Sequence, residues 1–214
     1  MVLLRRINAI LQIVRDNGPE ELEFIVTKLF MTLMLIVAYK GAFALETVPR
    51  VDIKRCMGDW YEIASIPNLW QADCYKNTKS HYGANSDGTF DLKKSCLTKG
   101  GQKKEITGTG LITNKETNAE FRISFIPILH YLGWFTGQYK MLLVDPEYRF
   151  AVLGTDSLEY GWILARLPNI PPRELAQIET QIRQMGYDSC KFKITIQERG
   201  PHMQAKPLCE VVKP

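Results

Sequence analysis

Cysteine is the residue type in this sequence with the most evident chemistry. Five cysteines occur in 214 residues, and an odd number in a protein that reaches an oxidising compartment indicates disulfides with one thiol left over. Cys74 and Cys96 flank a turn near residue 85, so they can pair across a hairpin if a bulge shifts the strand register. Cys190 and Cys209 flank the last expected strand and are a second candidate pair. These spacings leave the connectivity open.

Histidines and catalytic motifs indicate no enzymatic chemistry. The three histidines, His81, His130 and His202, are far apart, and the chain has no C-x-x-C, H-E-x-x-H, serine-hydrolase or phosphate-loop motif. We therefore expect no catalytic residues, no metal and no cofactor. Two alternatives stay open: a thiol enzyme, which needs a cysteine of low pKa facing a cavity beside a cation, and a haem carrier, which needs an inward histidine.

Composition and charge exclude further classes. The chain is 45% hydrophobic and 23% charged, which is typical of a folded domain rather than a disordered one. The net charge is +4, and basic residues alternate with acidic ones along the chain, so no basic stripe forms that could follow a phosphate backbone. We expect no nucleic-acid partner.

An apolar run of ten residues, 29–38, follows a lysine and precedes small residues ending at Ala44. Its length suits a secretory signal, whereas a membrane-spanning helix needs about 20 apolar residues. We expect cleavage after Ala44 and a secreted or periplasmic protein. No cysteine follows the small residues, so a lipid anchor is not indicated. The alternatives are an uncleaved amphipathic helix and a translation start near Val26 or Met31.

From Trp60 onward the sequence alternates between strand-forming segments and turns. Eight segments rich in β-branched and aromatic residues are separated by turn signals every 8–12 residues, about the spacing expected of barrels and sandwiches. The segments lie at 58–66, 74–84, 89–98, 103–114, 118–127, 137–145, 148–155 and 160–167.

Two further elements follow. After Pro171 and Pro172, apolar residues recur at helical spacing up to Gly186, which predicts an amphipathic helix against the outside of the sheet. Residues 192–196 alternate as a short ninth strand. Because closure removes the exposed edges of an up-and-down sheet, we expect an all-β fold: an eight-stranded antiparallel up-and-down β-barrel, or calyx, with a C-terminal α-helix and a short ninth strand. Such a barrel is just wide enough inside for one small ligand.

Three motifs in order along the chain resemble those of the lipocalin family, in the branch of bacterial lipocalins and apolipoprotein D. They are a G-x-W segment, a T-D-x-x-Y turn with Val144 in place of threonine, and a final-strand arginine; their residues are Gly58, Trp60, Asp145, Tyr148 and Arg166. The resemblance covers about residues 48–198. Together with the expected cleavage point, it divides the chain into an N-terminal extension and signal peptide at 1–44, a lipocalin domain at 45–198 and a C-terminal tail at 199–214; the extension and the tail depart from the family pattern.

The resemblance implies structural roles for the motif residues. The guanidinium of Arg166 should stack on Trp60 and close the floor of the barrel, and Asp145 should cap backbone N–H groups of its turn. The resemblance also implies a different disulfide, from Cys74 to Cys209, and a buried, unreactive Cys56.

The expected ligand-binding residues come from strand alternation and from the resemblance. If Arg166 lies at the closed end, alternation places Trp162 and Tyr160 inward; the resemblance implies pocket positions for Trp162, Tyr139 and Tyr82. Met141 and Leu143, two and four positions after Tyr139, should face the same side of the strand and extend the apolar wall. The set is Tyr82, Tyr139, Met141, Leu143, Tyr160 and Trp162. Aromatic rings and flexible methionine suit an acyl chain; the alternative is a barrel that these side chains simply fill.

The function that the sequence favours is binding, and thereby transport or storage, of a small hydrophobic ligand such as a fatty acid or lysophospholipid. Residues 125–135 form an unusually apolar segment for the rim of a barrel. The alternative functions are therefore interaction with a receptor or peripheral contact with a membrane through this segment, or a rare lipocalin enzyme.

Overall fold

The computed structural model describes residues 26–28, 30–31, 45–126 and 137–212. The chain divides into two units, Met1–Ala44 and Leu45–Pro214, and in the first unit the described residues are helical. The expected cleavage point after Ala44 and most of the rim segment 125–135 lie outside the described residues. Among the residues described, no helix is long and apolar enough to cross a bilayer.

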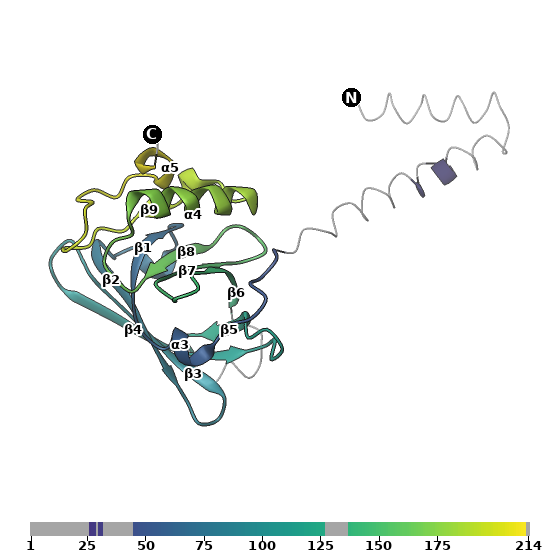
Figure 1. Ribbon diagram of the computed structural model, residues 1–214, viewed down its shortest axis with the longest axis horizontal. Helices are drawn as coiled ribbons and strands as arrows, with labels where there is room; N and C mark the ends of the chain where they lie inside the picture. The colour runs from purple at the N-terminus through teal and green to yellow at the C-terminus, as the bar shows by residue number, and fades with distance from the viewer. Residues whose placement is uncertain (1–25, 29, 32–44, 127–136, 213–214) are drawn as a thin grey trace, which may run out of the picture. The chain divides into compact units, whose positions relative to one another are not determined.

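The second unit is built on a closed antiparallel barrel (Figure 1). Strand β1 pairs with β8 on one side and with β2 on the other, so the sheet has no break between its first and last barrel strands. This confirms the eight-stranded up-and-down barrel expected from the sequence. The barrel strands are β1 (Gly58–Ser65), β2 (Lys76–Ala84), β3 (Thr89–Leu97), β4 (Lys103–Ile112), β5 (Glu120–Ser124), β6 (Gly137–Val144), β7 (Phe150–Gly154) and β8 (Gly161–Ala165).

Short elements lie at the barrel ends, and a longer helix covers one side. The helix α4 (Pro172–Gln184) follows the paired prolines, and the chain turns at Gly186, whose φ of +94° suits glycine. The helix and the ninth strand are thus confirmed. The remaining elements are α3 (Ile53–Cys56), η1 (Leu69–Gln71), η3 (Ser189–Lys191), β9 (Lys193–Ile194) and α5 (Leu208–Val211).

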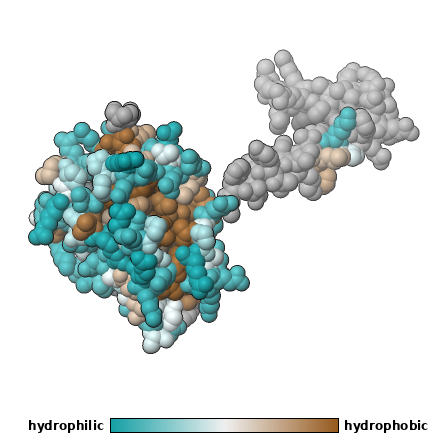
Figure 2. Space-filling model, in the orientation of Figure 1, coloured by the Kyte–Doolittle hydropathy of each residue, from teal (hydrophilic) through white to brown (hydrophobic). Residues whose placement is uncertain are grey.

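Two apolar clusters stabilise the unit, one inside the barrel and one under α4. Strand β8 contributes to both: Trp162 and Leu164 belong to the inner cluster and Ile163 to the outer one, as alternation along a strand requires. Leu208, from the C-terminal tail, is fully buried in the outer cluster. In Figure 2 hydrophilic residues cover much of the visible face, and apolar residues gather beside α4 and the strands below it.

Candidate functional site

The barrel contains a cavity of about 700 Å³, within the range of small-molecule sites. Strands β2 to β8 form its wall, and the η1 segment and the loop from β7 to β8 form its mouth. Its apolar lining includes Leu69, Leu92, Ile106, Ile123, Leu153 and Leu164, and its rings are Trp70, Tyr82, Phe125, Tyr139, Tyr160 and Trp162.

Four of the six expected ligand-binding residues lie together on this cavity wall. The rings of Tyr160 and Trp162 stack with centroids 6.2 Å apart, and Tyr139 lies 5.5 Å from Trp162. Tyr82 lines the cavity from β2, and its ring centroid lies 6.0 Å from that of Phe90. Burial raises the pKa of both Tyr82 and Tyr139, so both phenols are protonated and neutral throughout the physiological range.

The structure places the other two, Met141 and Leu143, away from this cavity. A register shift in the β6–β7 pairing falls between them, so the alternation that starts at Tyr139 does not continue through Leu143. Leu143 packs instead against the outer cluster beneath α4, and Met141 belongs to the inner cluster below the cavity. Parity along β6 therefore predicted the wrong side of the sheet for Leu143.

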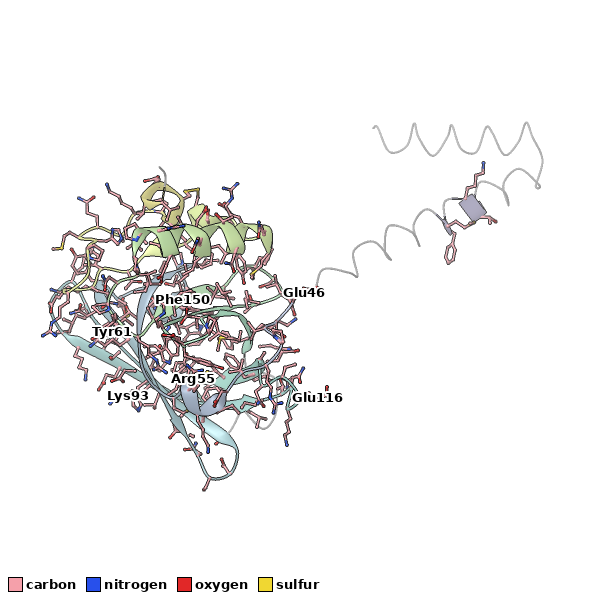
Figure 3. The ribbon with its side chains drawn as sticks, in the orientation of Figure 1. Glu46, Arg55, Tyr61, Lys93, Glu116 and Phe150 are labelled. Carbon is pink, nitrogen blue, oxygen red and sulfur yellow. A yellow bond between two sulfur atoms is a disulfide. The ribbon has the colours of Figure 1, made fainter. Side chains whose placement is uncertain are left out.

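The floor of the barrel has the arrangement that the motifs imply. The guanidinium of Arg166 lies 3.8 Å from the centroid of the Trp60 ring and donates to the carbonyl oxygens of Arg55, Met57 and Asp59 at 2.5, 2.9 and 2.7 Å. Figure 3 labels Arg55 at this end of the barrel. Trp60 is 2% exposed and donates through Nε1 to the carbonyl of Cys56 at 2.7 Å. Arg166 thus connects α3, the residue after it and β1 at the floor.

The turn after β6 also matches its motif. Asp145 accepts from the backbone N–H groups of Glu147 and Arg149 at 3.0 and 3.1 Å, and the Arg149 guanidinium binds the same carboxylate. These hydrogen bonds, led by that of the Arg149 side chain, lower the pKa of Asp145. Tyr148 adopts a φ of +58°, and its hydroxyl accepts from the N–H of Asp52 at 2.7 Å. Asp145 thus caps this turn, as expected from the sequence.

The cysteines form two disulfides, Cys74 to Cys96 and Cys190 to Cys209, with Cα atoms 5.6 and 4.9 Å apart. The alternative pair of Cys74 with Cys209 is not formed. The register shift that the first pair needs occurs in the β2–β3 pairing. Cys56 is the remaining thiol; burial raises its pKa to about 11, so at neutral pH it is a protonated thiol and a poor nucleophile.

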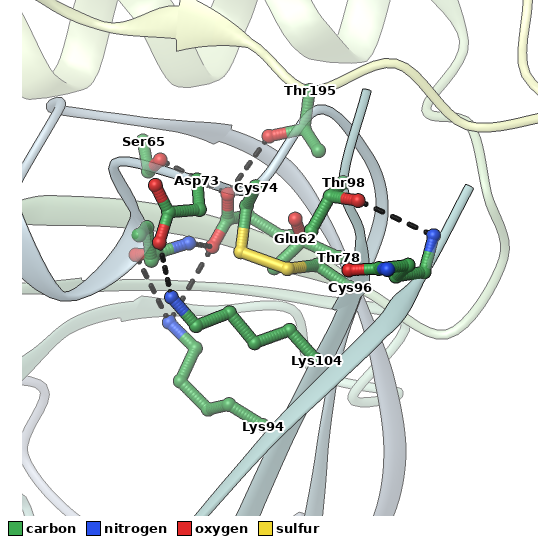
Figure 4. Close-up of a disulfide and its surroundings, with 12 residues drawn as sticks. Glu62, Ser65, Asp73, Cys74, Thr78, Lys94, Cys96, Thr98, Lys104 and Thr195 are labelled. Atoms are coloured by element: carbon green, nitrogen blue, oxygen red, sulfur yellow. Dashed lines mark hydrogen bonds and ion pairs between the residues drawn. A yellow bond between two sulfur atoms is a disulfide. The ribbon is translucent and has the colours of Figure 1, made fainter. Parts of the chain in front are cut away.

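A polar cluster at the side of the cavity was not predicted from the sequence (Figure 4). Its centre is Glu62, which is 2% exposed, and Lys94 reaches it from β3. Glu62 follows Trp60 by two positions on β1, so alternation alone would place it inward. The other members are Ser65, Gln71 and Thr195.

Charged side chains at and near the cavity mouth are paired. Lys104 forms an ion pair with Asp73, and Lys140 binds Asp156 at 2.8 Å. The N–H of Leu45, the first residue of the barrel unit, donates to the same Asp156 carboxylate at 2.9 Å. In the part of the chain that the structure describes, no group of three or more histidine, cysteine or acidic side chains is arranged to hold a metal ion.

A closed antiparallel barrel with a floor at one end and an aromatic-lined cavity at the other defines a calyx protein. Residues 51–197 match the lipocalin-like domain family, and this chain belongs to the lipocalin family. It is 31% identical to temperature-induced lipocalin-1 of Arabidopsis thaliana over 73% of this chain and 85% of that protein. It is 29% identical to outer membrane lipoprotein Blc of Escherichia coli K12, over 73% and 84%.

More distant relatives and solved structures agree on the fold. Apolipoprotein D of Mus musculus is 24% identical over 70% of this chain and 79% of that protein. The cockroach allergen Per a 4 superposes with a TM-score of 0.56 at 16% identity, covering 72% of this chain and 94% of that structure. Insecticyanin from the tobacco hornworm Manduca sexta gives 0.54 at 16% identity, over 73% and 89%.

Proposed function

We propose that this protein binds and carries or stores a single-chain lipid, such as a fatty acid or lysophospholipid, inside the calyx. The observation that carries the proposal is the cavity of about 700 Å³ beside the stacked rings of Tyr160 and Trp162. Because burial of each methylene group contributes about 0.8 kcal/mol, an acyl chain gains affinity from such a wall without specific polar contacts.

The experiment is titration calorimetry with a series of single-chain lipids of increasing length. Affinity should rise about fourfold for each added methylene that the cavity holds and then level off. Trp162→Ala should weaken binding about 10- to 30-fold, as loss of a buried aromatic anchor does. Tyr75→Ala is the control, since Tyr75 is 44% exposed and outside the cavity wall. Absence of binding across the series would refute the proposal, as would affinities that Trp162→Ala leaves unchanged.

We propose further that the protein acts by binding and not by catalysis. The only thiol outside the disulfides, Cys56, has a raised pKa of about 11, which opposes nucleophilic chemistry. Turnover of a bound thioester or peroxide by wild-type protein, lost in Cys56→Ser, would contradict this.

Export with cleavage after Ala44 is the localisation that we propose. Leu45 begins the compact barrel unit, and its N–H donates to Asp156, so the new N-terminus would gain a charged partner there. The names of two relatives support export: outer membrane lipoprotein Blc is named for the outer membrane, and apolipoprotein D is named as a component of lipoprotein. Mass spectrometry of the exported protein should give a chain that begins at Leu45; an intact N-terminus would exclude cleavage.

Peripheral membrane contact is a second candidate function, and it is favoured by the apolar side chains exposed at the mouth of the cavity. Leu69 is 92% exposed and Trp70 is 67% exposed, and both lie in η1 beside the cavity opening. Large apolar side chains so exposed at one site are typical of interaction surfaces. Flotation with phospholipid vesicles should be reduced in a Leu69→Ser, Trp70→Ser double variant and retained in the control Leu167→Ser, which lies beside the barrel floor. Equal flotation of both variants would refute membrane contact through η1.

A further inference from the structure

The polar cluster beside the cavity is built around a carboxylate that lies behind the cavity wall. Glu62 is 2% exposed and does not line the cavity. Neutral donors already satisfy its two oxygens: Ser65 Oγ at 3.0 Å, Thr195 Oγ1 at 2.8 Å and Gln71 Nε2 at 2.8 Å. Glu62 therefore does not depend on Lys94 for its hydrogen bonds.

Lys94, by contrast, lines the cavity and is held only loosely. Its Nζ lies 3.5 Å from Glu62 Oε2 and 3.2 Å from Gln71 Oε1, both at the long end for a charge-assisted hydrogen bond. An ammonium has three donors, and within residues 45–126 and 137–212 no acceptor takes the third. The Trp162 ring lies 5.3 Å from the ammonium. Burial lowers the pKa of Lys94, as expected of an incompletely compensated cation.

Two acidic side chains that line the cavity have closer partners than Lys94 has. Glu105 binds Lys103 at 2.8 Å, and Asp156 binds Lys140 at the same distance. The Lys94 side chain is 15% exposed, whereas that of Lys104 at the mouth is 50% exposed. Of the two lysines that line the cavity, Lys94 is therefore the more buried, and its ion pair with Glu62 holds its ammonium at the cavity wall.

We propose that Lys94, positioned by Gln71 and Glu62, is the head-group subsite of the calyx, and that the ligand is an amphiphile with an anionic oxygen group on its apolar chain. The inference rests on the proposed carrier function and specifies its ligand class. A carboxylate or phosphate oxygen supplies the acceptor that the third Nζ donor lacks, and its chain lies along the Trp162 ring. A neutral head group supplies no charge to strengthen the hydrogen bond from the third Nζ donor, and a cationic one meets repulsion.

The test compares ligands of equal chain length on the full-length protein at pH 8: a fatty acid, the corresponding fatty alcohol and a single-chain phosphate monoester. Wild-type protein should bind both anions at least about tenfold more tightly than the alcohol. Lys94→Met should abolish this preference while alcohol binding persists. Lys104→Met, at the mouth of the same cavity, should retain it.

Each outcome decides a separate question. If wild-type protein binds the alcohol as tightly as the acid, the head-group subsite is wrong while the carrier function stands. If none of the three ligands binds, the carrier function itself fails. A preference for only one anion identifies carboxylate or phosphate as the natural group. Because the wild-type comparison needs no variant, misfolding of Lys94→Met leaves the proposal testable, and Lys94→Arg then serves as the variant that should keep the preference.

Discussion

Replacing Arg166 with alanine should destabilise the barrel by about 3 kcal/mol. The guanidinium donates to three backbone carbonyl oxygens and lies 3.8 Å from the Trp60 ring centroid. A hydrogen bond from a charged group contributes roughly 1.5–3 kcal/mol and a desolvated cation–π contact about 2 kcal/mol. Water can reach part of this site after truncation and replace some of these bonds, so the expected net loss is well below their sum.

Equilibrium unfolding in urea, with the disulfides intact, measures this loss. For a chain of this size, 3 kcal/mol corresponds to a fall in Tm of about 6–12 °C. Arg166→Lys should recover less than half of it, because one ammonium cannot reach three carbonyls in the geometry of a planar fork. Arg173→Ala is the control, since Arg173 is exposed on α4. A loss below about 1 kcal/mol for Arg166→Ala would refute the view that this side chain holds the floor.

Three further changes test other parts of the structure. Asp145→Asn should lower the free energy of unfolding by about 1–2 kcal/mol at pH 7. Because hydrogen bonds lower the pKa of the Asp145 carboxyl in the folded state, this stability difference should be complete above about pH 4 and should disappear as the pH falls through the folded pKa. Unfolding curves of both proteins at acid pH would show this. Gly110→Ala should cost about 1–3 kcal/mol, since the added Cβ would lie 2.0 Å from Phe90 Cζ; an unchanged Tm would contradict the packing of that ring. Replacing Cys74 and Cys96 together by serine should cost about 2–4 kcal/mol in denaturant and leave the far-UV circular dichroism unchanged, and loss of the β-sheet signal would show that barrel closure needs this disulfide.

Alternation predicted part of the cavity from the sequence because β8 runs without interruption in its pairing with β7. Once Arg166 is placed at the floor, Trp162 follows four positions up the same face. The same argument failed for Leu143 because a register shift interrupts the pairing of β6 with β7. The sequence has no glycine or proline between Met141 and Leu143 from which this shift could be predicted. Local sequence thus predicts side-chain direction only as far as the pairing stays regular.

The polar cluster could be predicted only in part, for a different reason. Its spacing to Trp60 places Glu62 on the same face of β1 by alternation, but its partners come from distant segments: Lys94 from β3 and Thr195 from the chain after β9. Which of these side chains meet depends on strand registers and on how the C-terminal segment packs. Those are properties of the whole fold, so a single sequence does not reveal them.

The pairing of β1 with β8 determines how late in synthesis the barrel can close. Tyr61 lies opposite Ala165, about a hundred residues later, and contacts between such distant positions form slowly because a long loop must close first. Arg166, which donates hydrogen bonds at the floor, follows the last barrel strand in the sequence. During synthesis the calyx therefore cannot exist until nearly the whole barrel has left the ribosome. Until that point the chain has no cavity, so the calyx becomes able to bind a ligand only after the last barrel strand has paired.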